Sequence, residues 1–245
     1  IAETGGLNGM FVDTTALKEQ VVDDVVLSAF GSAGQRCSAL RILFLAKDTA
    51  DLVIETIKGA MDALVIGDPA DPATDIGPVI DEVARGALQA HLEHLQQEAK
   101  VLHRLEAPDG GTFFGPVLAE IPSATFLPRE VFGPILHIVR YDPAQLDKVA
   151  SELAGQGYGL TLGVHSRIDA FAQEVRALVP AGNVYVNRSI IGAVVGVQPF
   201  GGEGLSGTGP KAGGPNALSR YAIERAVSVN ITAQGGDPAL LNLSL

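Results

Sequence analysis

The chain has 245 residues, of which 47% are apolar and 18% charged, a composition typical of a globular protein with a sizeable core and not of a disordered one. Its 17 basic and 28 acidic residues give a formal net charge of −11, which argues against nucleic acid or an anionic membrane as the main partner, because both require a basic face. No apolar run reaches the roughly 18 residues of a transmembrane helix. A single cysteine fits a reducing compartment, most simply the cytoplasm.

Short apolar runs alternate along the chain with longer segments of helical periodicity. Apolar residues that recur every three or four positions indicate helices with one buried face, whereas short apolar runs bounded by turns indicate buried strands. In chain order this pattern predicts a strand over 7–12, a helix over 16–30, a strand over 41–46, a helix over 49–64, a loop over 67–78, a helix over 82–99, extended segments over 101–105, 113–121 and 135–141, a helix over 143–153, a strand over 160–165, a helix over 168–178 and a strand over 183–187.

This alternation is typical of an α/β fold in which helices cover the faces of a mostly parallel sheet. Residues 189–215 interrupt it with a glycine-rich, irregular stretch, after which we expect a helix near 216–223 and a strand near 226–231. In sheets of this kind, functional sites collect in loops beyond the carboxyl ends of the strands. The fold class therefore directs attention to loops that follow strands.

Cys37, the only cysteine, lies in a loop of glycines and small residues between a predicted helix and a predicted strand. It has no partner for an internal disulfide, so it is either a small buried side chain or a reactive thiol. The charge of Arg36 can favour the thiolate, and Ser38 places a hydroxyl beside the sulfur. Because this loop precedes a strand, the carboxyl-end rule does not favour it as a site, and both interpretations stay open.

A nucleophilic thiol usually needs a base. None of the five histidines lies in a recognisable cysteine-protease setting. His91 and His94 share one face of a polar helix, but no further ligands accompany them, so we interpret them as solvated and expect no metal site. Glu3, followed by two glycines, is the other candidate base, although on its own it fits an exposed carboxylate equally well.

Two further motifs have both a structural and a functional interpretation. Gly202, Gly204 and Gly207 match a formal G-x-G-x-x-G pattern, but it lacks the preceding strand and following helix of a dinucleotide-binding turn, so we interpret it as a long loop near a site. Glu130 and Phe132 are two positions apart and share one side of an extended chain. They are either a loop carboxylate and a core ring, or a carboxylate for sugar hydroxyls beside a ring for stacking.

Four motifs taken together resemble the aldehyde dehydrogenase superfamily. Cys37 follows Glu3 by 34 residues, a separation similar to that between the base and the nucleophile of that family. Within the superfamily, Gly-Gln-Arg-Cys-Ser-Ala-Leu-Arg at 34–41 is similar to the glutamate semialdehyde (Δ1-pyrroline-5-carboxylate) dehydrogenase domain of the bifunctional proline utilization A enzymes. The four motifs, in order, are Glu-Thr-Gly-Gly at 3–6, Gly-Gln-Arg-Cys at 34–37, Glu-Val-Phe-Gly-Pro at 130–134 and Pro-Phe-Gly-Gly at 199–202.

The resemblance implies NAD⁺-dependent oxidation of L-glutamate γ-semialdehyde to L-glutamate. Cys37 would attack the aldehyde and Glu3 would activate the water that hydrolyses the resulting thioester. Glu130 would bind the nicotinamide ribose of NAD, with Phe132 packed nearby. The residues implied to bind the substrate, through its carboxylate and its aliphatic part, are Ser38, Gly192, Ala193 and Phe200. Another semialdehyde dehydrogenase, or a non-catalytic assembly fragment, is the alternative.

The resemblance also implies a domain organisation. Residues 1–14 would be the end of an NAD-binding domain that lies upstream, residues 15–225 the catalytic domain, and residues 226–245 an oligomerisation strand and tail. The chain opens without methionine in what reads as the end of an element, so we expect it to be part of a longer polypeptide. Its expected partners are a small aldehyde, further copies of the same chain and the upstream domains.

Overall fold

The computed structural model describes residues 1–230, and most of them fold around a seven-stranded sheet. The strand order is β3-β4-β5-β2-β1-β7-β8, and every neighbouring pair is parallel except β3 and β4 at one edge. This architecture confirms the α/β class with a mostly parallel sheet. The strands are β1 (Asn8–Val12), β2 (Leu40–Ala46), β3 (Lys100–Arg104), β4 (Val117–Glu120), β5 (Ile135–Tyr141), β7 (Thr161–His165) and β8 (Asn183–Val186).

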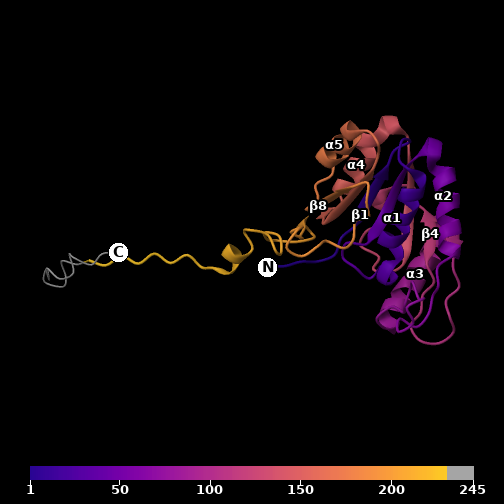
Figure 1. The fold of residues 1–245 in the computed structure, drawn as a ribbon, viewed down its shortest axis with the longest axis horizontal. Helices are drawn as coiled ribbons and strands as arrows, with labels where there is room; N and C mark the ends of the chain where they lie inside the picture. The colour runs from indigo at the N-terminus through magenta and orange to yellow at the C-terminus, as the bar shows by residue number, and fades with distance from the viewer. Residues whose placement is uncertain (231–245) are drawn as a thin grey trace.

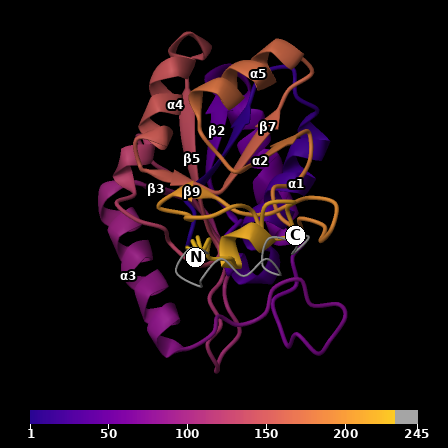
Figure 2. The same cartoon turned by 90° about the vertical axis from the view of Figure 1, so that its left-hand side faces the viewer.

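Helices cover both faces of the sheet (Figure 2). One face carries α1 and α2, and the opposite face carries α3 and α4 with α5 beside them. None of the described helices combines the length and the apolar character needed to cross a membrane. The helices are α1 (Lys18–Phe30), α2 (Lys47–Asp62), α3 (Glu82–Glu98), α4 (Leu146–Ala154) and α5 (Asp169–Leu178).

The central strands are apolar because both of their faces are covered. Every residue of β1 and of β2 is buried, as expected for parallel strands between two helical layers. The rings of Phe11 and Phe44 stack across this pair with centroids 4.3 Å apart. Such continuous burial fixes the centre of the sheet and leaves the loops at its ends to vary.

The C-terminal region differs from the sequence expectation. In place of a helix over 216–223 there is one 3-10 turn, Leu218–Tyr221, because glycines and a proline precede it and no surface packs against it. Residues 222–230 have no regular secondary structure, are exposed, and run away from the α/β body (Figure 1). The predicted strand and tail over 226–245 lie partly outside the described residues, and that oligomerisation element stays a prediction.

Candidate active site

The segments that carry the candidate residues gather at the amino ends of the parallel strands. Glu3 lies before β1, Cys37 before β2 and Glu130 before β5, while Thr161 and Asn183 are the first residues of β7 and β8. The candidate residues thus lie at the opposite ends of the strands from those that the carboxyl-end rule favours. The position of Cys37 directly before β2 agrees with the expectation that its loop precedes a strand.

The loop before Cys37 has an unusual backbone. After α1, the residues Ser32, Ala33 and Gly34 all have positive φ, at 56°, 53° and 63°. This left-handed conformation costs non-glycine residues roughly 1–2 kcal/mol each, so tertiary contacts must hold it. Gly34 has a second constraint, because a Cβ atom there would overlap the carbonyl group of Gly133. The turn thus presses the cysteine loop against the segment that follows Glu130.

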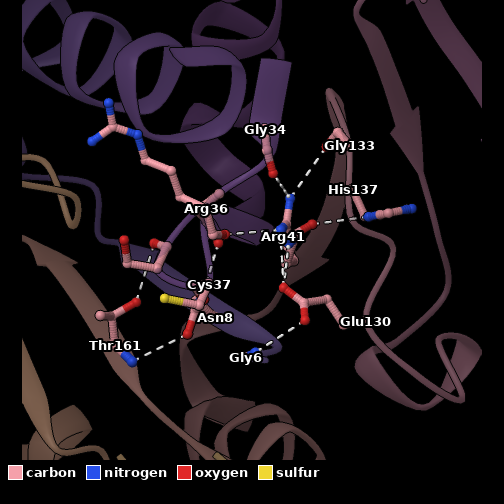
Figure 3. Close-up of polar contacts among 12 residues, drawn as sticks. Gly6, Asn8, Gly34, Arg36, Cys37, Arg41, Glu130, Gly133, His137 and Thr161 are labelled. Carbon is pink, nitrogen blue, oxygen red and sulfur yellow. Dashed lines mark hydrogen bonds and ion pairs between the residues drawn. The ribbon is translucent and has the colours of Figure 1, made fainter. Parts of the chain in front are cut away.

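Buried polar side chains fix the backbone around Cys37. Asn8 donates from Nδ2 to the carbonyl oxygens of Cys37 (2.7 Å) and Ala39 (2.8 Å), and its Oδ1 accepts the Thr161 N–H (3.1 Å) (Figure 3). The Thr161 hydroxyl donates to the Ser38 carbonyl (3.3 Å). Asn8 is an unmarked polar residue at the start of an apolar strand in the sequence. Together, Asn8 and Thr161 hold the three successive backbone carbonyls of residues 37–39 in place.

The Cys37 thiol is half-buried and free. Burial raises its pKa, and the carboxylates of Glu130 and Glu3 raise it further, against the backbone N–H groups of Ser38 and Cys37, which lower it. Arg36 does not supply the thiolate-stabilising charge that its position in the sequence suggests. Its Nε donates to the Ser32 hydroxyl (2.9 Å), and the side chain points away from the sulfur (Figure 3).

Arg41 connects the cysteine loop to the Glu130 segment. Its side chain is fully buried, and its donors reach the carbonyl oxygens of Gly34 (2.8 Å), Gly133 (3.2 Å) and Arg36 (3.0 Å) (Figure 3). Both Nε (3.3 Å) and Nη2 (2.9 Å) also donate to Oε1 of Glu130. The sequence offered one signal for this residue, a lone charge at the start of the apolar run Ile-Leu-Phe-Leu-Ala.

Glu130 and Phe132 both contact Arg41. Burial raises the pKa of Glu130, while the guanidinium and the Gly6 N–H (3.2 Å to Oε2) lower it. A Cβ atom on Gly5 would overlap that carboxylate, so glycine is required there. The Phe132 ring lies with its centroid 5.2 Å from the Arg41 guanidinium carbon and is 46% exposed. The structure thus places a carboxylate and an accessible aromatic ring against the same guanidinium, that of Arg41.

Glu3 is exposed and is held by pairing of its segment with the glycine-rich loop. The backbone N–H of Thr4 donates to the Ser206 carbonyl (3.1 Å), and that of Thr208 donates to the Ala2 carbonyl (3.1 Å). The formal glycine motif there forms a two-residue strand, β9 (Glu203–Gly204), that pairs with β6 (Tyr158–Gly159). It is not followed by a helix, which agrees with our rejection of a dinucleotide fingerprint.

The segment that carries Phe200 is bound at the amino end of β8. Asn183 binds this segment, since its Nδ2 donates to the Pro199 carbonyl (2.9 Å) and its Oδ1 accepts the Gly201 N–H (3.2 Å). Phe200 is half-buried beside these contacts. Gly192 has φ of 75° and is exposed, Ala193 is half-buried, and Ser38 is buried. Asn183 also accepts from Lys211 Nζ (3.3 Å), and nothing in the sequence marked it.

The histidines differ from the expectation of solvated side chains. His91 lies with its Nε2 2.9 Å from Nε2 of the fully buried His137, whose Nδ1 lies 2.9 Å from the Arg41 carbonyl oxygen. Burial lowers the pKa of His137 to about 3 and that of His91 to about 4. His94 is exposed and stacks on Phe126. Within residues 1–230, no group of three potential ligands could hold a metal ion.

A half-buried free thiol with two carboxylates in its electrostatic surroundings, at the edge of an α/β sheet, can support covalent catalysis by a cysteine. The model of the aldehyde dehydrogenase family, in which such chemistry occurs, matches residues 1–227. The chain therefore belongs to the aldehyde dehydrogenase family.

Within this family, the chain is similar to several known proteins. The bifunctional protein PutA of Klebsiella aerogenes is 49% identical over 251 residues, covering 98% of this chain and 19% of that protein. A crystal structure of bifunctional proline utilization A (PutA) superposes with a TM-score of 0.90 at 57% identity, covering 96% of this chain and 24% of the other. The structure of 1-pyrroline-5-carboxylate dehydrogenase from Thermus with bound NAD superposes with a TM-score of 0.81 at 35% sequence identity. The match covers 89% of this chain and 42% of the other. The chain thus spans less than half the length of these relatives.

Proposed function

We propose that this chain is the catalytic part of an NAD⁺-dependent dehydrogenase that oxidises L-glutamate γ-semialdehyde to L-glutamate, the second step of proline breakdown. The observation that carries the proposal is the convergence of Cys37, Glu130 and Glu3 at the amino ends of the parallel strands. The chain belongs to the aldehyde dehydrogenase family, and its relatives are named for proline utilization and 1-pyrroline-5-carboxylate.

In this proposal Cys37 is the nucleophile. Its thiolate adds to the aldehyde carbon to form a thiohemiacetal, and its own backbone N–H helps to hold the oxyanion. Bound NAD⁺ would supply the hydride acceptor for that carbon, and loss of the hydride together with the proton of the former aldehyde oxygen would leave a thioester on Cys37. Glu3 takes a proton from a water molecule, whose oxygen attacks the thioester; glutamate leaves and the thiol is restored.

The cofactor would meet this chain at Glu130 and Phe132. The contact of Glu130 with Arg41 opposes the effect of burial on its pKa, and as a carboxylate Glu130 can accept hydrogen bonds from the two ribose hydroxyls. The Phe132 ring offers its exposed side for packing. The substrate carboxylate would lie against the hydroxyl of Ser38 and the backbone N–H groups of Gly192 and Ala193, which agrees with the open left-handed backbone of Gly192. Phe200 would pack against the aliphatic part of the substrate.

A longer polypeptide is part of the proposal, since the chain spans 19% of the bifunctional relative and 42% of the single-function one. An upstream domain would hold the rest of NAD, with residues 1–14 as its last edge, residues 15–225 as the catalytic domain and residues 226–245 as the oligomerisation tail. Exposed apolar side chains just before the tail and at its start support a homo-oligomer, and we place the protein in the cytoplasm. They are Leu218, Tyr221, Ile223, Val227 and Val229.

Steady-state and burst kinetics of the full-length polypeptide test the function. We expect kcat/KM for glutamate semialdehyde to exceed that for succinate semialdehyde, and Cys37→Ala to lower turnover by at least about a thousandfold. Glu3→Ala should retain a rapid burst of NADH formation followed by slow steady-state turnover, because the base acts only in hydrolysis of the thioester, after hydride transfer. A preference for succinate semialdehyde would reassign the substrate, and an inert Cys37 with no NAD⁺ binding would favour an assembly fragment.

A further inference from the structure

We infer that Arg41 is a positioning residue that couples cofactor binding to the nucleophile loop, an inference that rests on the function proposed above. One guanidinium contacts both sides of the site: the carbonyls of Gly34 and Arg36 on the cysteine loop, and Glu130 on the cofactor side. It also lies over the Phe132 ring.

The geometry of these contacts is specific to an arginine. Five N–H donors in a planar fork reach carbonyl and carboxylate oxygens that come from two segments far apart in the sequence, and the side chain has no exposure to solvent. A lysine in its place can hold one or two of these oxygens but not all of them. Since a buried charge needs such partners, the arrangement requires both loops in their observed positions.

Arg41 also controls the charge of Glu130. The groups that face this carboxylate are the Arg41 guanidinium on β2, the Cys37 thiol on the preceding loop and the Gly6 N–H before β1. Burial disfavours the carboxylate and Arg41 is the only cation among these groups. Loss of Arg41 therefore raises the pKa of Glu130, and a protonated Glu130 no longer accepts from both ribose hydroxyls.

Arg41→Met in the full-length polypeptide separates this role from a general contribution to folding. NAD⁺ affinity of the wild type should change little between pH 6 and 9. In the variant, the Kd should be at least about tenfold weaker at pH 6 and should recover as the pH rises, because Glu130 is again ionised. Arg140→Met is the matched control: Arg140 binds Asp51 (2.8 Å) and Glu120 (3.0 Å) near the carboxyl end of β5, away from the site.

Arg41→Lys keeps the charge and tests the inference if the methionine variant does not fold. It should hold NAD⁺ affinity within about threefold of wild type and stay flat with pH, yet alter the alkylation rate of Cys37 at least about fivefold, because the carbonyls of Gly34 and Arg36 lose donors. Two results would overturn the inference and leave the proposed function standing. One is a folded Arg41→Met variant with wild-type, pH-independent NAD⁺ affinity, and the other is an Arg41→Lys variant with wild-type Cys37 reactivity. A wild-type polypeptide that binds no NAD⁺ overturns the proposed function and the inference with it.

Discussion

The reactivity of the Cys37 thiol depends on its surroundings in space and not on its neighbour in the sequence. Burial and the carboxylates of Glu130 and Glu3 raise the pKa of the thiol above its ordinary value of 9.0, so the protonated form prevails at neutral pH. In the proposed reaction the attacking form is the thiolate. The chain therefore holds its proposed nucleophile in a protonated state, and a nearby positive charge would favour the reactive thiolate.

Alkylation by iodoacetamide measures this property directly, because Cys37 is the only cysteine. We expect the rate to rise with pH and to reach its half-maximum above pH 9, since only the thiolate reacts. Glu3→Gln removes one of the carboxylates that raise the pKa, so its rate at pH 8 should be about twofold higher. Glu98→Gln, at the exposed end of α3, should leave the rate unchanged. A plateau reached below pH 8 would contradict the assigned environment.

Single residues of the site could be recognised from the sequence only where they belong to a motif. Cys37 and Glu130 were proposed in this way, and the structure brings them close enough for the carboxylate to raise the thiol pKa. Arg41 and Asn183 were missed, because their importance comes from backbone carbonyls supplied by distant segments. Arg36 was misjudged for the converse reason: adjacency in the chain says nothing about where a flexible side chain points.

The turn between α1 and β2 is the element that sets the position of Cys37. Gly34 has positive φ and lies against Gly133, so a side chain there meets both strain and overlap. We predict that Gly34→Ala lowers the free energy of unfolding by about 2–3 kcal/mol. Urea denaturation followed by circular dichroism measures the change.

Gly59 provides the matched substitution within the same chain. It lies inside α2, and a Cβ atom there would have no heavy atom within 4 Å. Gly59→Ala should therefore raise the free energy of unfolding by about 0.5–1 kcal/mol, because alanine loses less backbone entropy in a helix. Equal effects of the two substitutions would show that the turn carries no special constraint.

Elements were easier to predict than the way they meet. The helices over 18–30 and 82–98 and the strand over 135–141 follow from apolar periodicity, which burial of one or both faces imposes. The helix expected over 216–223 is largely absent, since periodicity promises a helix only where a surface packs against it. The carboxyl-end rule favours the opposite ends of the strands from those where Cys37, Glu130 and Glu3 lie, so the fold rule and the motifs pointed to different ends of the sheet.

At the scale of the whole molecule, a buried polar contact joins the sheet to the helix α3 that covers it. His137 on β5 bridges the Arg41 carbonyl on β2 and His91 on α3, and it is fully buried. In neutral His137 one imidazole nitrogen donates to the Arg41 carbonyl and the other accepts from His91. A proton added to His137 would face both His91 and the Arg41 guanidinium, which lower its pKa in addition to burial. Helix α3, the sheet and the site thus share one titratable contact.

The stability of the chain should therefore fall in acid. In the unfolded chain His137 takes up a proton near its ordinary pKa of 6.5, whereas in the folded chain it does so only near about 3, so its contribution is full above pH 6.5 and is lost as the pH falls towards 3. The loss amounts to as much as about 4 kcal/mol. His137→Gln should make the dependence of unfolding free energy on pH between 6.5 and 4 shallower, measured by urea titration, while His91 and His165, whose pKa values burial lowers to about 4, maintain the rest of it. His94→Gln on the exposed side of α3 should leave the dependence unchanged. An unchanged slope in His137→Gln would assign the acid sensitivity to other groups, since glutamine can still donate to the Arg41 carbonyl but cannot become charged.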